Sequence, residues 1–485
     1  MAITTYTQGA GDAFRNLGDY AADLVTPTVR LGVTGLARSG KTVFITALVH
    51  NFIAGGRLPF FEAAAQGRLA RAYLEPQPDD AVARFEYENH LADLTGDPPC
   101  WPESTRRISQ LRLTLEYAST RFWKRQLGRE KLHVDIVDYP GEWLLDLPLL
   151  ELDYVDWART ALAQSRAPSR KKAAKDWHAA VHEVDPAAPA DEARAAKLSD
   201  LFKSYLREAR SDQYALSTLP PGRFLMPGDL EGSPALTFAP LDPDGEVEFP
   251  RGSLWTMMAR RYEAYKAHVV RPFFRDHFAR LDRQIVLVDV LTALDGGEEA
   301  VNDLERAMTE ILECFRTGAN TLWSSLFAPR IDRIVMAATK ADHLHQQSHD
   351  RLEAILARLT GRAMARAKYA GAEVKALALA SVRATREGEA RRNSEKLPCI
   401  IGYPLAGETI GRRTFDGDEE FAIFPGDLPK DPDKALKGWH TEDADLRFVR
   451  FRPPDPKLLP SGGFAPFPNI RLDRAVQTLI GDRLA

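Results

Sequence analysis

The residues best suited to chemistry lie in GLARSGKT, residues 35–42. This segment satisfies the phosphate-binding pattern G-x-x-x-x-G-K-[ST] in full. Two glycines let the backbone curl so that successive N–H groups point at phosphate oxygens, and the helix that follows adds the positive end of its dipole. We expect Lys41 to reach the β- and γ-phosphates and the Thr42 hydroxyl to coordinate Mg²⁺. The predicted nucleotide-binding residues here are Gly35, Ala37, Arg38, Ser39, Gly40, Lys41, Thr42 and Val43.

The metal and γ-phosphate side is predicted in VDIVDYPGEW, residues 134–143. Asp138 ends an apolar strand, where an acid beside a phosphate loop can hold Mg²⁺ through water. The N–H of Gly141, three residues later, is placed to sense a γ-phosphate. A switch threonine should lie upstream of Asp138. Thr105 is the predicted metal residue, with Ser104 as its competitor, and either could instead be a turn residue before a strand.

The base side is predicted in TKAD, residues 339–342. The Asp342 carboxylate can accept from both N1–H and the exocyclic amine of guanine, whereas adenine offers no such donor pair. The stem of Lys340 can lie against the base. Thr339 stands where asparagine is usual, and its hydroxyl can still brace the phosphate loop. Farther on, Ser381 and Val382 could offer backbone N–H groups to the guanine O6 oxygen.

These candidate residues require strands that deliver them to one edge of a sheet. TPTVRLGVTG (26–35) has the pattern of a buried strand, and the apolar run after the phosphate loop has helical spacing. The remaining strands are predicted at 108–117, 131–141, 283–291, 332–340 and 374–381, with amphipathic helices near 297–316 and 348–368. Apolar runs such as IVLVDVL are typical of parallel strands buried on both faces.

The alternation of strands and helices predicts an α/β fold with a mostly parallel sheet, the fold of a P-loop GTPase G domain. A helical stretch interrupts it between the D-x-x-G strand and the next core strand. We expect an N-terminal arm (1–25), a first part of the G domain (26–141), a helical insertion (142–281), a second part of the G domain (282–388) and a C-terminal extension packing on the G domain (389–485).

Composition narrows the function classes. The net charge is −4, from 64 basic and 68 acidic residues, which gives no electrostatic reason to expect nucleic acid as a partner. Three scattered cysteines, Cys100, Cys314 and Cys399, fit neither a disulfide framework nor a metal cluster, so a reducing compartment is expected. The start of the chain lacks the features of a signal peptide, and no stretch approaches the roughly 20 apolar residues of a membrane span. A cytoplasmic location is predicted.

At this point the chain resembles the YcjX-like family of bacterial P-loop GTPases. The resemblance covers nearly the whole sequence and is carried by GLARSGKTVFITALVHNF, VDYPGEWLLDLPLL, VVRPFFRDHFARLDRQIVLVDVL, RIDRIVMAATKADHL and FAIFPGDLP. It implies GTP and GDP binding with hydrolysis and a stress-linked role. It also implies a membrane-associated protein partner, YcjF, and with it a peripheral position at the inner membrane.

The predicted catalytic residues are Lys41, Glu142 and Arg38. Glu142 stands where many GTPases have a water-orienting glutamine. A carboxylate can accept a hydrogen bond from water but cannot donate one to the γ-phosphate, and the alternative is the first-turn acid of a helix. Arg38 could stabilise charge on the transferred phosphoryl group. A loop arginine that faces solvent or a partner is the alternative.

Three functions fit the sequence. The first is a Mg²⁺-dependent regulatory GTPase whose helical insertion transmits the nucleotide state. The second is a nucleotide-loaded scaffold with little turnover that acts through a membrane-associated partner. The third is a P-loop ATPase or kinase, which TKAD opposes because its carboxylate suits guanine. A homodimer that completes the site is also compatible with the sequence.

Overall fold

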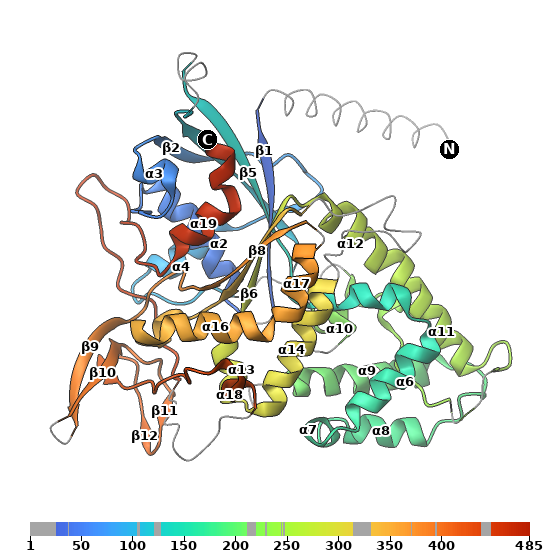
Figure 1. Cartoon of the computed structure of the whole chain (residues 1–485). Helices are drawn as coiled ribbons and strands as arrows, with labels where there is room; N and C mark the ends of the chain where they lie inside the picture. The colour runs from blue at the N-terminus through green and yellow to red at the C-terminus, as the bar shows by residue number, and fades with distance from the viewer. Residues whose placement is uncertain are drawn as a thin grey trace.

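The structure is a computed structural model of the chain. It describes residues 26–36, 38–103, 107–120, 128–210, 220–227, 230–243, 245, 248–313, 331–369, 371–392, 395–437 and 448–485. Figure 1 shows a central twisted sheet with helices on both sides, a helical region between α6 and α12, and small hairpins formed by β9 to β12 at a corner of the molecule. In the described ranges, no helix is long and apolar enough to cross a membrane.

The main sheet has the strand order β2-β4-β5-β1-β6-β7-β8 in the described part of the chain. Its parallel core consists of β1 (Thr28–Gly35), β5 (Glu130–Asp138), β6 (Arg283–Val288), β7 (Arg333–Ala338) and β8 (Glu373–Ala378). β4 (Ser109–Tyr117) and β2 (Leu69–Glu75) are antiparallel to their neighbours, and β3 (Ala83–Arg84) adds a short parallel pair to β4. The expected α/β class with a mostly parallel sheet is confirmed, as a mixed sheet. β2 and β3 lie outside the predicted strands.

One face of the sheet packs against α2 (Lys41–Ile53) and α19 (Leu472–Ile480). Alternate strand residues such as Val29, Leu31 and Val33 point into this core, which also contains buried residues of α19. Three shorter elements lie at its margins: α3 (Glu62–Ala65), α4 (Tyr87–Thr95) and the three-ten helix η8 (Gly481–Leu484). Segments that are far apart in the sequence therefore share this core.

The helical region packs on the other face of the sheet, in one hydrophobic cluster with it. It contains η1 (Gly141–Glu151), α6 (Tyr154–Ser165), α7 (Pro168–Lys171), α8 (Lys175–His182), α9 (Glu192–Ala209), α10 (Gly222–Leu225), η3 (Pro234–Leu236), α11 (Leu254–Tyr265), η4 (Lys266–Val270), α12 (Arg271–Asp276) and η5 (Phe278–Arg280). Aromatic side chains fill its interior, where Trp157 stacks on Tyr262 with ring centroids 4.9 Å apart. A buried ion pair between Arg170 and Asp303 joins α7 to α14 (Glu298–Glu313).

Two stretches of the predicted helical insertion are not regular α-helix. The stretch 261–281 is divided into the end of α11, the π-helix η4, α12 and η5. Pro272 explains the π-turn, because proline lacks an N–H and clashes with the carbonyl four residues earlier. The stretch after Gly141 begins as the three-ten helix η1, which contains Pro148.

The remaining helices and strands follow β6. Helices α13 (Val290–Asp295), α14, α16 (His349–Leu359) and α17 (Gly361–Tyr369), with the short η6 (Ala341–His343) and η7 (Gln346–Ser348), connect the last core strands. The C-terminal part forms a small sheet, β13-β10-β9, from β9 (Arg386–Arg392), β10 (Glu395–Gly402) and β13 (Phe421–Ile423). It also contains the hairpin β11 (Thr409–Ile410) and β12 (Arg413–Thr414), and α18 (Pro432–Leu436).

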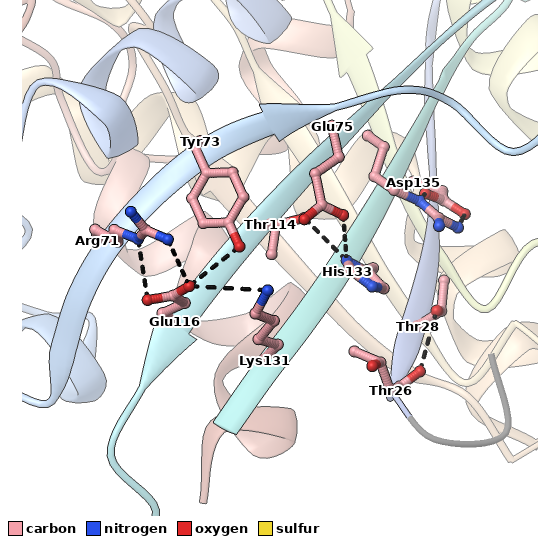
Figure 2. A network of polar contacts seen from close by, with 11 residues as sticks. Thr26, Thr28, Arg71, Tyr73, Glu75, Thr114, Glu116, Lys131, His133 and Asp135 are labelled. Atoms are coloured by element: carbon pink, nitrogen blue, oxygen red, sulfur yellow. Dashed lines mark hydrogen bonds and ion pairs between the residues drawn. The ribbon is translucent and has the colours of Figure 1, made fainter. Parts of the chain in front are cut away.

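Polar side chains cover one side of β2, β4 and β5 at the sheet edge (Figure 2). Glu116 pairs with Arg71 at 2.9 Å, and the Arg112 guanidinium binds Asp135 through two hydrogen bonds of 2.7 and 2.9 Å. The Arg71 side chain is 63% exposed, so this end of the face meets solvent. Apolar and polar residues therefore alternate along β4 and β5, unlike the near-continuous apolar runs of the central strands.

Candidate functional site

The phosphate loop joins β1 to α2 in a tight turn. The N–H of Ser39 donates to the Leu36 carbonyl at 3.2 Å, and Arg38 and Gly40 have left-handed backbones with φ of 63° and 83°. Gly40 suits this conformation because it has no Cβ. The Lys41 ammonium donates to the Gly35 carbonyl at 2.8 Å, so the lysine side chain folds back across the phosphate loop.

Close packing leaves no space for a side chain at Gly35, at the start of the loop, or at Gly141 beside it. A Cβ added at Gly35 would lie 2.3 Å from Ser39 Oγ and 2.5 Å from the Leu287 carbonyl oxygen. A Cβ added at Gly141 would lie 2.5 Å from the Gly35 carbonyl oxygen. The structure therefore brings Gly141 against the phosphate loop, as the predicted γ-phosphate role requires. Ala37 lies outside the described residues, and Val43 lies half-buried in the first turn of α2.

The predicted metal residues Thr42 and Asp138 follow neighbouring parallel strands. Asp138 pairs in register with Val33, two residues before Gly35, and is 1% exposed. The Thr42 hydroxyl donates to the Glu103 carbonyl at 3.4 Å. Thr105 and its competitor Ser104 lie outside the described residues, directly after Glu103. A hydroxyl and a carboxylate are hard oxygen donors that suit Mg²⁺, which takes its other ligands from phosphate and water. The described residues contain no cluster of three His, Cys, Asp or Glu side chains that could hold a metal by themselves.

Glu142 is almost fully buried and forms an ion pair with Arg210, with Oε1 and Nη2 2.9 Å apart. Arg210 caps the carboxyl end of α9 in the helical region. Glu142 also lies in the first turn of η1, which is the helix-start position considered above. The arginine partner was not predicted. It connects the residue after the D-x-x-G glycine to a distant helix.

Asp146 forms a second connection between η1 and the rest of the helical region. It is buried, and its carboxylate accepts from the Gly222 N–H at 2.6 Å and from the Tyr265 hydroxyl at 2.5 Å. Burial raises the pKa of Asp146 to about 6, although these donors act in the opposite direction. A Cβ added at Gly222 would lie only 2.0 Å from the Glu142 carbonyl oxygen. The first turns of η1 are thus held from α9, α10 and α11.

Arg38 is exposed at the tip of the phosphate loop. Partial desolvation, followed by the nearby charges of Arg450 and Arg210, lowers the pKa of its guanidinium, and Asp289 acts in the opposite direction. Arg38 stays protonated at neutral pH because an arginine starts from so high a value. Guanidinium groups from the phosphate loop, the helical region and the C-terminal part therefore converge near this loop. Such a region attracts anions.

The TKAD segment follows β7. The Lys340 ammonium binds Asp289 at 2.5 Å, and Asp289 caps α13 by accepting from the Thr292 N–H at 3.1 Å. Burial alone would raise the pKa of Asp289, but the Lys340 ammonium and the Thr292 donors outweigh it and lower that pKa. The Thr339 hydroxyl donates to the Val288 carbonyl at 3.4 Å. It thus braces the end of β6, where we had expected the phosphate loop.

Asp342 and the segment after β8 lie together. Asp342 is 4% exposed, and its Oδ2 accepts from the Ala384 N–H at 2.9 Å. Its carbonyl accepts from the Thr385 hydroxyl at 2.5 Å. Ser381 and Val382 precede these two residues and are also buried. The structure therefore brings the two predicted base-recognition segments into direct contact.

Two residues of this region were not predicted from the sequence. Asp289 directly follows the apolar run IVLV, so it carried the same strand-end signal as Asp138. Arg210 carried no such signal, because it lies at the end of an ordinary amphipathic helix. Its contact with Glu142 depends on the path of the whole helical region.

A cavity of about 570 Å³ lies beside η1 and is distinct from the phosphate loop. Trp143 and Phe273 line it, together with Arg107 and with His268 of the π-helix η4. The Arg223 guanidinium covers the Trp143 ring, 3.0 Å from its centroid. The cavity thus touches the residue after Glu142 and a residue close to the Thr105 segment.

Sequence comparisons relate the whole chain to known proteins. The sequence profile of the YcjX-like family (DUF463) matches residues 29–484. A protein named Ras-like GTPase YcjX from Escherichia coli (strain K12) is 39% identical over 467 residues, covering 94% of this chain and 96% of that relative. A protein of the same name from Shewanella oneidensis is 33% identical over 478 residues and 94% of each chain.

Proposed function

Because the chain belongs to the YcjX-like family, we propose that it binds guanine nucleotide with Mg²⁺ and hydrolyses GTP. The observation that carries this proposal is the meeting of four segments at one sheet edge. The phosphate loop, Asp138, TKAD and the Ser381 segment follow β1, β5, β7 and β8, which are parallel. Ligands of such sheets bind outside the carboxyl ends of the strands. The names of the two relatives agree with the proposal.

On the phosphate side, the backbone N–H groups between Gly35 and Thr42 surround the phosphates. Lys41 exchanges its Gly35 carbonyl contact for oxygens of the β- and γ-phosphates. Thr42 and Asp138 would hold Mg²⁺, which would neutralise charge on the phosphate oxygens. The N–H of Gly141, which already lies against Gly35, donates to the γ-phosphate.

On the base side, Asp342 accepts from the two guanine donors while its contact with Ala384 keeps the carboxylate oriented. The Lys340 stem lies along the base, with its ammonium held by Asp289. Ser381 and Val382 present N–H groups to O6. This arrangement favours guanine over adenine, because adenine offers no paired donors to Asp342.

We infer that the helical insertion transmits the nucleotide state. When Gly141 moves toward a γ-phosphate, Glu142 and Asp146 move with it, and both are held by the helical region. An interface with such close contacts resists small shifts and responds by changing between discrete arrangements. The insertion then presents a different surface in the GTP and GDP states.

Turnover is expected to be slow without assistance. The Glu142 carboxylate is paired with Arg210, so positioning water would require this pair to rearrange. Arg38 could supply charge to the transition state from within the loop. Otherwise a partner or a second copy of the chain supplies it. If a second copy does, specific activity rises with protein concentration.

Nucleotide binding on purified protein tests the proposal. Lys41→Ala should abolish tight GTP binding, and Thr42→Ala should remove the dependence on Mg²⁺. Asp342→Asn should shift preference from GTP toward xanthosine triphosphate, because the amide presents a donor where guanine needs an acceptor. Wild-type affinity in Lys41→Ala would refute the phosphate site. An unchanged preference of Asp342→Asn for GTP over ATP and xanthosine triphosphate would refute the base site.

The second candidate is a nucleotide-loaded scaffold with little turnover, and the buried Glu142–Arg210 pair favours it. A single-turnover hydrolysis assay separates the two, since a scaffold retains GTP unhydrolysed. A stress-linked role through a membrane-associated partner, from a cytoplasmic position at the inner membrane, follows from the resemblance alone. The cavity beside Trp143 would let such a partner contact the switch segments. A P-loop ATPase or kinase would bind ATP in preference to GTP.

A further inference from the structure

The C-terminal part of the chain reaches the nucleotide site through residues 448–452. This segment lies along residues 403–405, with hydrogen bonds of 2.8 Å from the Leu405 N–H to the Arg450 carbonyl and 2.9 Å from the Arg452 N–H to the Tyr403 carbonyl. Phe451 is 1% exposed and packs in a cluster with Ile400, Phe415, Ile423 and Val449. The small C-terminal sheet therefore fixes the position of Phe451.

The Phe451 ring also contacts the base-recognition segment. It lies edge-on to the ring of His343, with centroids 5.4 Å apart and an interplanar angle of 84°. His343 directly follows Asp342 in the chain. Ala384, whose N–H donates to the Asp342 carboxylate, packs against the same cluster as Phe451. The orientation of Asp342 thus depends on side chains from outside the main sheet.

The Phe451 backbone contacts a second segment beside the site. Its carbonyl accepts from Trp101 Nε1 at 2.6 Å. Trp101 and Val43 pack on a small cluster that contains Val382, one of the predicted base-binding residues. Two residues after Trp101, the Glu103 carbonyl accepts from the Thr42 hydroxyl. One residue is therefore connected to the base side through its ring and to the metal side through its backbone.

We propose that Phe451 is a positioning residue of the guanine site, a role that rests on the function proposed above. Phe451 holds the Asp342 and Trp101 segments at a fixed separation. Recognition of guanine requires the Asp342 carboxylate to meet two donors at once, so a small rotation of this loop weakens binding. Removal of the ring leaves a cavity that the His343 and Ala384 loops can relax into. Bound GDP then leaves faster, and the preference for guanine over hypoxanthine, which lacks the exocyclic amine, becomes smaller.

The experiment measures release of fluorescent N-methylanthraniloyl-GDP and the affinity ratio of GDP to IDP. The matched control is Phe415→Ala, which removes a ring from the same cluster. Phe415 follows the β11–β12 hairpin and packs against Phe421, with ring centroids 5.0 Å apart and an interplanar angle of 59°. Phe451→Ala should accelerate release about tenfold and reduce the GDP-to-IDP ratio. Trp101→Phe keeps an aromatic ring but loses the N–H donor. It should accelerate GDP release a few-fold, as expected for the loss of one hydrogen bond. Phe415→Ala should stay within about twofold of wild type in both quantities, even where it lowers Tm.

Equal release rates and equal base ratios in Phe451→Ala and Phe415→Ala would overturn the inference, since any effect would then be general destabilisation. Should Phe451→Ala fail to fold, Phe451→Leu and Trp101→Phe carry the test, and wild-type release from both would overturn it. A wild-type protein that does not bind GDP refutes the proposed function and this inference with it. Normal binding by wild type with unaltered release from the variants refutes the positioning role alone.

Discussion

Replacing Gly222 with alanine places a methyl group against the backbone of the switch segment η1. The added Cβ would lie 2.0 Å from the Glu142 carbonyl oxygen and 2.5 Å from its carbonyl carbon. Ordinary contact between such atoms is about 3.5 Å, so α10 and η1 must separate by more than about 1 Å. Backbone atoms cannot rotate away as a long side chain can. The change therefore moves Glu142, or α10, or both.

The expected loss in the free energy of unfolding is about 3 kcal/mol. Overpacking of this kind costs about 1–3 kcal/mol, and a weakened hydrogen bond to a charged group costs about 1.5–3 kcal/mol. The bond in question joins the Gly222 N–H to the Asp146 carboxylate at 2.6 Å. The two costs partly replace each other, because separation of α10 from η1 relieves the overlap and lengthens the bond. For a chain of 485 residues, this loss corresponds to a fall in Tm of about 3 °C.

Thermal denaturation and GTP turnover test this reasoning. Turnover should fall, because Glu142 is displaced, while GDP affinity stays close to that of wild type. The control is Gly361→Ala at the start of α17, where an added Cβ meets nothing within 4 Å. Alanine there should be neutral or stabilise the protein slightly. A Gly222→Ala protein with the Tm and turnover of wild type would refute the role assigned to the contact between α10 and η1.

Three further predictions concern charged residues. Glu142→Ala should reduce GTP turnover at least about tenfold with little change in GTP affinity, as expected for an interaction made in the transition state, and Arg38→Ala tests assistance from within the loop in the same assay. If Glu142→Ala hydrolyses GTP at the wild-type rate, Glu142 is only the first-turn acid of η1 and has no catalytic role. Burial raises the pKa of Asp146 from 3.8 to about 6, so the unfolded chain loses this proton first as pH rises. The contribution of this group to the free energy of unfolding therefore falls by about 3 kcal/mol as the pH rises from 4 to 6. Urea unfolding of Asp146→Asn should not show this loss of stability with pH. The same pH dependence in Asp146→Asn and wild type would contradict the prediction. Asp303→Ala should lower the free energy of unfolding by about 3 kcal/mol, because it removes the ion-pair partner of the buried Arg170 guanidinium. The double variant Arg170→Met/Asp303→Leu should lower it by less, because it leaves no buried charge from this pair. Denaturation of both variants checks the order, and a greater loss in the double variant would contradict it.

The strand-end residues of the site could be predicted because parallel strands deliver their carboxyl ends to one edge. Apolar runs identified β1, β5, β6, β7 and β8, and motif residues were predicted at the ends of all of them except β6, where Asp289 was missed. The edge strand β2 was missed because its residues are mostly half-exposed and carry no strong periodic pattern. Local sequence patterns therefore predict which residues lie at the ends of buried strands, and they are less informative for strands at the edges of a sheet.

Contacts between distant segments could not be predicted. The Glu142–Arg210 pair and the Phe451–Trp101 hydrogen bond each join segments that are far apart in the sequence. These segments come together only when the whole chain is folded. Thr339 illustrates the same limit on a smaller scale. Its residue type allowed a brace to the phosphate loop, but the register of β6 and β7 places the Val288 carbonyl beside it.

The core beneath the main sheet also has a consequence for synthesis on the ribosome. β1 and α2 emerge hundreds of residues before α19, yet Leu472 and Leu479 of α19 fill the same core as Leu31 and Val33. Until residues 472–480 leave the exit tunnel, this apolar face is covered by α2 but lacks the apolar residues of α19, and the nascent phosphate loop lacks its final support. Nucleotide binding should thus begin only late in translation. Ribosome-bound chains arrested near residue 470 should remain sensitive to protease even with GDP present, whereas chains extended well past residue 484 become resistant.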